Sequence, residues 1–117
     1  MCQVSVEELW WARVASLLDA EGCIRKNQAC IDIRMCDKDL IQMCFDVTGV
    51  RNNMTVRTLK SGKLQYGIYI TGKDQVERCL KRMLPYLGER RTQQANNLLN
   101  WIAKSPNKRH HIQTIND

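Results

Sequence analysis

The sequence predicts an α+β domain in which four antiparallel strands carry helices on one face. Two segments, residues 23–35 and 53–71, alternate apolar and polar residues with the period of a strand. Four other segments space their apolar residues three and four apart, as amphipathic helices do. The order is helix, two strands, helix, two strands, two helices, which favours a sheet built from two hairpins. We expect one domain over residues 1–104 and a polar tail over residues 105–117.

The first helix is predicted to begin after Ser5 and to end at Gly22. The stretch Ser5-Val-Glu-Glu8 has the capping-box pattern of a helix start. The apolar residues that follow at helical spacing are Leu9, Val14, Leu17 and Leu18. A glycine after the last of them is a common helix end.

The first hairpin follows, with Lys26-Asn-Gln28 as its turn. Its apolar face comprises Ile24, Ile31, Ile33 and Met35. Its polar face comprises Arg25, Asp32 and Arg34. This alternation predicts one face toward the core and one toward solvent.

The rest of the chain repeats this plan and then adds two helices. Asp37 is placed to cap a second helix and Gly49 to end it. A second hairpin turns at residues 60–63, with an apolar face of Met54, Val56, Leu64, Tyr66, Ile68 and Ile70. A third helix ends before Pro85, and a fourth runs from about Glu89 to Ser105.

Composition favours a polyanionic partner. The net charge is +6 in 117 residues, which favours nucleic acid or an anionic membrane surface as the partner. No apolar run approaches the length of a membrane span, and of the two partners we expect nucleic acid and no membrane. The N-terminal residues lack a signal-peptide pattern, so we expect the chain to work in the bacterial or phage-infected cytoplasm or an organelle matrix. The six cysteines lack zinc-finger spacing, and most are expected to be buried thiols.

The polar face of the predicted sheet is basic and rich in hydrogen-bonding groups. A β-ribbon fits the major groove of duplex DNA, where Arg, Lys, Asn and Gln contact purine edges and phosphates. The alternative is a plain solvated face, which antiparallel sheets normally have. The candidate DNA-binding residues are Arg25, Lys26, Asn27, Gln28, Arg34, Arg57, Lys60, Lys63, Gln65 and Tyr69.

The first helix ends on a carboxylate, at Glu21, where its own carbonyls already carry partial negative charge. Glu21 and the carbonyls around Gly22 offer only oxygen ligands, which suit Mg²⁺. The alternative is an ordinary exposed glutamate.

Three small residues, Ala12, Ser16 and Ala20, lie four apart along the same helix. They form a stripe where two helix backbones can approach closely. The stripe either meets another helix of the same domain or meets its own copy across a two-fold axis. In the second case the two Glu21 carboxylates lie near each other beside that axis.

The stretch "VASLLDAEGCI" resembles the motif of the LAGLIDADG homing endonucleases. Val14 to Gly22 lies over its nine letters, with Ser16 for the first glycine and Glu21 for the second acid. The element order is similar to that family's αββαββα(α) fold with its saddle-shaped sheet. The segment "LPYLGERRTQQANNLL" also resembles the one after the second hairpin in single-motif members, and the likeness spans about residues 8–103. A single motif copy implies a homodimer.

The resemblance also implies roles for particular residues. Glu21 falls at the acidic position that binds the divalent metal, and Gly22 where a backbone carbonyl joins it. Ser16 and Ala20 fall at dimer contacts, and Asp19 at a structural acid. The residue near the scissile phosphate is Arg91, with Arg90 as the alternative. The polar residue near the end of the second strand has no convincing match at Met35 or Cys36.

The implied reaction is Mg²⁺-dependent hydrolysis of both strands of DNA at a long pseudo-palindromic site, as in intron homing. Glu21 and the metal stabilise charge on the attacking and leaving oxygens, and Arg91 offsets charge on the phosphorus centre. Three alternatives stay open: a DNA-binding protein that does not cut, an intron RNA maturase on the same scaffold, and a basic structural protein without a site.

Overall fold

The protein, seen in a computed structural model, is described over residues 5–104. The helices are α1 (Val6–Glu21), α2 (Lys38–Thr48), α3 (Lys73–Met83), the short 3-10 helix η1 (Leu84–Tyr86) and α4 (Glu89–Lys104). The strands are β1 (Gly22–Ile24), β2 (Cys30–Met35), β3 (Thr55–Thr58) and β4 (Leu64–Thr71). The predicted α+β class and element order are confirmed, and the predicted tail, residues 105–117, lies outside the described residues.

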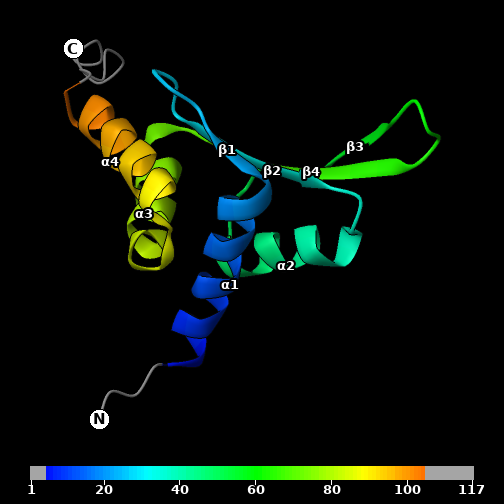
Figure 1. The fold of residues 1–117 in the computed structure, drawn as a ribbon, viewed down its shortest axis with the longest axis horizontal. Helices are drawn as coiled ribbons and strands as arrows, with labels where there is room; N and C mark the ends of the chain where they lie inside the picture. The colour runs from blue at the N-terminus through cyan, green and yellow to red at the C-terminus, as the bar shows by residue number, and fades with distance from the viewer. Residues whose placement is uncertain (1–4, 105–117) are drawn as a thin grey trace, which may run out of the picture.

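The four strands form one antiparallel sheet in the order β1-β2-β4-β3. Both hairpin tips rise above the middle of the sheet, which gives it a concave upper face (Figure 1). Helices α1 and α2 lie under the sheet, α3 and α4 lie together at one side, and none of the described helices covers the concave face.

The core lies between the helices and the lower face of the sheet. The strand residues Ile31, Ile33, Ile68 and Ile70 are almost fully buried there, as the alternation predicts. Helix residues Val14, Leu18, Ile41, Val76 and Leu80 complete this core and are fully buried. Val56 and Leu64 were expected on the same face, but they are 54% and 45% exposed because the β3–β4 hairpin extends beyond α2 (Figure 1).

The predicted helix ends are present, with one difference. The Ser5 side chain accepts the Glu8 N–H at 3.1 Å, and Gly49 ends α2 in the left-handed conformation. In a full capping box the Glu8 side chain returns to Ser5. Here the Glu8 carboxylate instead accepts from the Tyr86 hydroxyl and from Arg82, so it ties α1 to α3 and η1.

Among residues 5–104, no helix is both long and apolar enough to cross a bilayer.

Candidate functional site

The end of α1 passes directly into β1 at Gly22. Gly22 is extended and pairs with Ile33, while its N–H donates to the Leu18 carbonyl. A Cβ at this position would lie 2.4 Å from Leu18 Cδ1 and 2.9 Å from the Leu18 backbone. The turn from helix to strand is therefore so tight that only glycine fits, and this fixes Glu21 at the helix end.

The Glu21 carboxylate is exposed and has no hydrogen-bond or ion-pair partner within the described part of the chain. The last turn of α1 holds no basic residue. A carboxylate beside the negative end of a helix is unfavourable by ~0.3–1 kcal/mol. A cation bound there would interact favourably with both the carboxylate and the helix end, and would offset this penalty.

Arg91 reaches the end of α1 from the first turn of α4. Its Nη2 donates to the Gly22 carbonyl at 2.7 Å, and its Nη1 donates to Gln94 Oε1 at 2.8 Å. Its Nε is buried and has no partner among the described residues. Arg90, the alternative in the sequence, is exposed on the same turn. The structure thus brings Arg91 to the residue next to Glu21.

Asp19 holds the start of α4 against α1. Its two carboxylate oxygens accept the Gly88 N–H at 3.1 and 2.9 Å. Gly88 directly precedes α4, so the carboxylate also lies near the positive end of that helix. This contact is structural, and it places Arg91 at Gly22.

The donors at the end of α1 fit a hard divalent cation. Glu21 offers a carboxylate and Gly22 a carbonyl with a second lone pair beside the Arg91 bond. Residues 5–104 contain no group of three or more His, Cys, Asp or Glu side chains that could hold a metal. Mg²⁺ often takes one or two carboxylates and otherwise binds water and phosphate. The end of α1 therefore offers two oxygen donors of the kind that Mg²⁺ prefers, fewer than a site built from protein ligands alone would need.

The last residue of β2, Met35, and the residue after it, Cys36, have no charged or amide side chain. Strand β2 contacts α1 and runs two residues beyond Ile33, the partner of Gly22, to end at Met35. The next charged residue is Asp37, whose carboxylate caps α2 by accepting the Leu40 N–H at 3.3 Å. Cys36 is exposed between them.

The concave face of the sheet carries the candidate DNA-binding residues. Arg57 lies opposite Gln65, and Tyr69 lies opposite Asp32. Turn residues Lys26, Asn27 and Gln28 are exposed, and so are Lys60 and Lys63 near the other turn. Asn27 has a positive φ of 58°, which a tight turn requires and asparagine tolerates. Both hairpins thus present donors on one side of the sheet.

Asp32 departs from the expectation of a solvated polar face, because it is only 2% exposed. Its Oδ2 accepts from Arg25 Nε at 3.1 Å and Nη2 at 2.8 Å. Arg34 Nε lies 3.5 Å from Oδ1. The hydrogen bond to Asp32 and its negative charge raise the pKa of Arg25. Sequence patterning missed this cluster because it depends on the register across the hairpin.

The small-residue stripe of α1 (Ala12, Ser16 and Ala20) is largely exposed, and the described helices cover only part of it. Ser16 and Ala20 are exposed and Ala12 is half-buried. Leu9, two helical turns before Ser16 on the same side, is 55% exposed. The core-facing side of α1 is a different one, formed by Trp11, Val14, Ala15 and Leu18.

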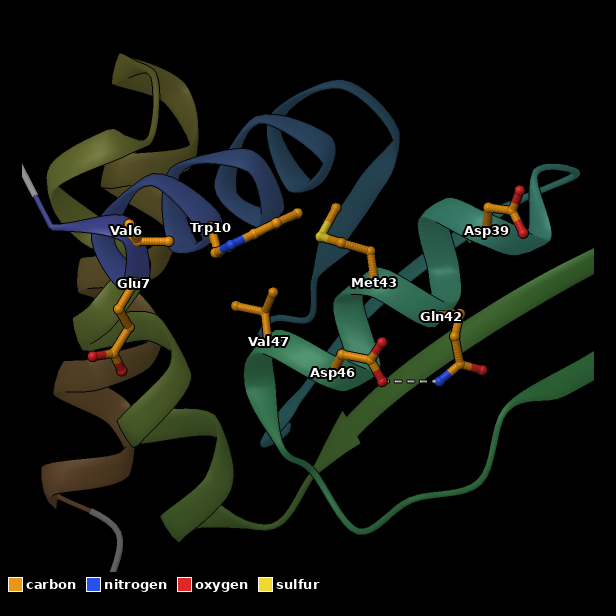
Figure 2. A pocket seen from close by; sticks show the side chains of 8 residues that line it. All are labelled: Val6, Glu7, Trp10, Asp39, Gln42, Met43, Asp46 and Val47. Atoms are coloured by element: carbon orange, nitrogen blue, oxygen red, sulfur yellow. Dashed lines mark hydrogen bonds between the residues drawn. The ribbon is translucent and has the colours of Figure 1, made fainter.

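A groove of about 680 Å³ lies between α1 and α2, away from the sheet's concave face (Figure 2). Its apolar lining is Val6, Trp10, Met43 and Val47. Its carboxylates are Glu7, Asp39 and Asp46, and Asp46 accepts from Gln42 at 3.1 Å. These carboxylates repel phosphate, whereas the exposed cations of the two hairpins lie on the other side of the molecule.

Comparison with known proteins places the fold. No protein-family model matches the chain, and no curated protein matches its sequence. The homing endonuclease I-CvuI, solved in complex with its target Sro1.3 in the presence of Ca, has a TM-score of 0.66 at 22% identity over 88% of this chain and 71% of that chain. I-CvuI solved with the I-CreI target in the presence of Mg, with the DNA not cleaved, has a TM-score of 0.64 at 23% identity over 87% and 71%. The chain therefore has the fold of LAGLIDADG homing endonucleases.

Proposed function

We propose that the chain is a homodimeric, Mg²⁺-dependent endonuclease that cuts both strands of DNA at a long pseudo-palindromic site. The observation that carries the proposal is the meeting of Glu21, Gly22 and Arg91 at the end of α1, beneath a concave basic sheet. The fold shared with I-CvuI, which is solved with DNA, supports the same activity.

Charge and shape support duplex DNA as the substrate. The described arginines and lysines of both hairpins lie on or beside the concave face, whereas the groove on the other side is acidic. A concave face with exposed donors suits the major groove, and its cations suit phosphates.

Two copies joined through α1 make the site complete. The exposed stripe of Ser16 and Ala20, extended by Leu9, offers a close helix contact with few side chains to displace. A two-fold axis beside this stripe brings two Glu21 carboxylates together and aligns two sheets along one duplex. Each protomer then supplies one Glu21, one Gly22 carbonyl and one Arg91, and the dimer has one such set for each DNA strand.

The chemistry assigns each group a separate task. When bound, Mg²⁺ lowers the pKa of a coordinated water and neutralises charge on phosphate oxygens. Glu21 and the Gly22 carbonyl hold the cation. Arg91 presents a guanidinium to the phosphate, where negative charge grows during in-line attack. Asp19 and Gln94 keep α4 and Arg91 in place.

A second candidate is a DNA-binding protein that does not cut. One observation favours it: β2 ends at Met35, and neither Met35 nor the following Cys36 has a charged or amide side chain. I-CvuI itself is seen with Mg and an uncut duplex, so binding and cleavage need separate assays.

Replacing Glu21 separates these two functions. Glu21→Gln is expected to lower the Mg²⁺-dependent cleavage rate at least ~100-fold, the scale of losing one transition-state stabilising group, while DNA affinity stays within about twofold. Glu77→Gln, which removes a carboxylate that pairs with Lys81 within α3, is the matched control and should cut normally. Full cleavage by Glu21→Gln would remove Glu21 from the reaction. A wild-type chain that binds one sequence and never cuts it would favour the second candidate.

A further inference from the structure

The concave face holds one deeply buried carboxylate among its cations. Asp32 is 2% exposed, although it lies on the side of the sheet that no described helix covers. A carboxylate removed from water is costly unless charged donors surround it. Arg25 and Arg34 are those donors, and each keeps close to two fifths of its side chain exposed, 38% and 39%. In this cluster the carboxylate of Asp32 is therefore buried, and the guanidinium groups of Arg25 and Arg34 stay partly exposed.

The geometry leaves both arginines able to bind further groups. A guanidinium has five N–H donors. Arg25 uses two of them on Asp32, from Nε and Nη2, so three remain for a ligand. Arg34 directs only its Nε at Asp32, so both of its Nη groups remain. The edge of a guanine accepts two hydrogen bonds from one arginine, through O6 and N7.

The neighbouring strand β4 also restricts the Arg34 side chain. Arg34 pairs with Gly67 on β4, and a Cβ at Gly67 would lie 3.1 Å from Arg34 Cγ. The aliphatic part of the Arg34 side chain thus packs over Gly67, in space that a side chain at Gly67 would occupy. Because an ordered arginine has already lost rotamer freedom, it discriminates between bases at a lower entropic cost than a free one.

We propose that Asp32 is a specificity-determining positioning residue, which fixes Arg25 and Arg34 as paired readers of base edges in the DNA that the proposed function requires. The carboxylate also offsets one of the two positive charges. This weakens the pull of nearby phosphates on the arginines and favours contacts with bases.

The test is the base-preference profile of the variant Asp32→Asn, which keeps the shape of the side chain. Protein-bound duplexes are selected from a randomised library in Ca²⁺ or EDTA and sequenced, for the wild type and each variant. Arg25→Ala and Arg34→Ala first identify the base pairs that these two residues read, and Arg57→Ala identifies those read by the second hairpin. Asp46→Asn on α2 makes the same change of charge away from the sheet and is the matched control.

Asp32→Asn is expected to lower discrimination roughly tenfold at the positions assigned to Arg25 and Arg34, within the usual range for a bidentate contact. Discrimination at the Arg57 positions should hold, and affinity for random duplex should stay equal or rise, because one negative charge is removed. An unchanged profile, or an equal loss at every position, overturns the inference. A wild-type chain without any sequence preference overturns the proposed function and this inference together.

The wild-type chain provides a second measurement if Asp32→Asn does not fold. Arginine Nε–H signals in NMR spectra report whether a guanidinium is held. Those of Arg25 and Arg34 should be sharp and slow to exchange in the free protein and should shift on adding the selected duplex, whereas that of exposed Arg57 should exchange fast. Fast exchange at Arg25 and Arg34 overturns the inference.

Discussion

No described group of the protein stabilises the carboxylate of Glu21 at the end of α1. Glu21 ends α1, it is exposed, and no described cation accompanies it. A helix end normally favours Lys or Arg. Gly22 cannot change either, because a side chain there would overlap Leu18. On the proposed function, Glu21 and Gly22 form a metal site that lowers the stability of the metal-free fold.

The loss of stability caused by the Glu21 carboxylate can be measured in the absence of metal. Glu21→Gln should raise the free energy of unfolding by ~0.3–1 kcal/mol, because it removes a negative charge from the negative end of α1. Denaturant titration in EDTA at low ionic strength measures the change. Glu77→Gln, which breaks an i,i+4 ion pair, should instead lower stability by ~0.3–0.5 kcal/mol. A loss of stability in Glu21→Gln would show that its carboxylate has a favourable partner.

Buried thiols contribute to the loss of stability that is expected at alkaline pH. Burial raises the pKa of the Cys44 thiol from 9.0 to about 12, and burial also raises that of Cys79. Below pH 9 both thiols are protonated in either state, so their contribution is fully present. Between pH 9 and 12 the Cys44 thiol ionises in the unfolded chain but not in the folded one, so stability falls. Chemical unfolding across this range should show the decline, and Cys44→Ala should make it less steep. A decline of the same slope in Cys44→Ala would assign it to other groups.

At the scale of elements, the periodicity of the sequence was sufficient to predict most of the helices and strands. The isoleucines of β2 and β4 and the cap at Ser5 depend on neighbours a few residues away, so their placement could be predicted. Glu8 was expected to complete the cap but binds Tyr86, a residue 78 positions away. The burial of Asp32 depends on the register between two strands. Contacts of this kind cannot be derived from a local pattern.

The candidate site shows the same division. The position of Glu21 follows from the end of a helix that the sequence predicts. The position of Arg91 came from a resemblance, and the structure places it on the Gly22 carbonyl through the docking of α4 on Asp19. Gln94, which holds Arg91, carries no signal in the sequence, since glutamines are common on helix surfaces.

Helix α1 is the element that should join two protomers. Ser16→Trp places a large side chain in the exposed stripe and should lower the dimer association constant at least ~100-fold, because the two helix backbones can no longer approach closely. Sedimentation equilibrium measures the mass. Asn96→Trp, at an exposed position of α4, is the matched control and should remain dimeric. A dimeric Ser16→Trp would place the interface elsewhere, and a monomeric wild type would exclude the proposed assembly.

At the scale of the whole molecule, charge is divided between two sides. The net charge of +6 is carried in part by the arginines and lysines of the concave sheet, and the α1–α2 groove opposite is acidic. On the proposed function, such a division would orient the molecule toward a duplex before any base is read. Cations near the hairpin tips should then control affinity, and residues in the middle of the sheet should control sequence preference.

Salt dependence tests this division. The double variant Lys60→Gln, Lys63→Gln should weaken binding to all sequences alike. It should also reduce the slope of log affinity against log salt by about 0.9 for each phosphate that the variant no longer neutralises. Fluorescence titrations between low and moderate salt measure the slope. Lys81→Gln, on α3 and paired with Glu77, should leave the slope unchanged. Equal slopes in the wild type and the double variant would show that the β3–β4 turn does not touch the DNA.

The most direct measurement is cleavage of a randomised duplex library by the purified protein, with Mg²⁺ and with EDTA. We expect cuts only with Mg²⁺, in both strands, clustered at one site of approximate two-fold symmetry. Such a result would give the target sequence in the same experiment. Enrichment of a symmetric sequence that stays intact in Mg²⁺ would contradict the nuclease and leave a DNA-binding protein with the same fold. Preference for structured RNA over duplex DNA would contradict both.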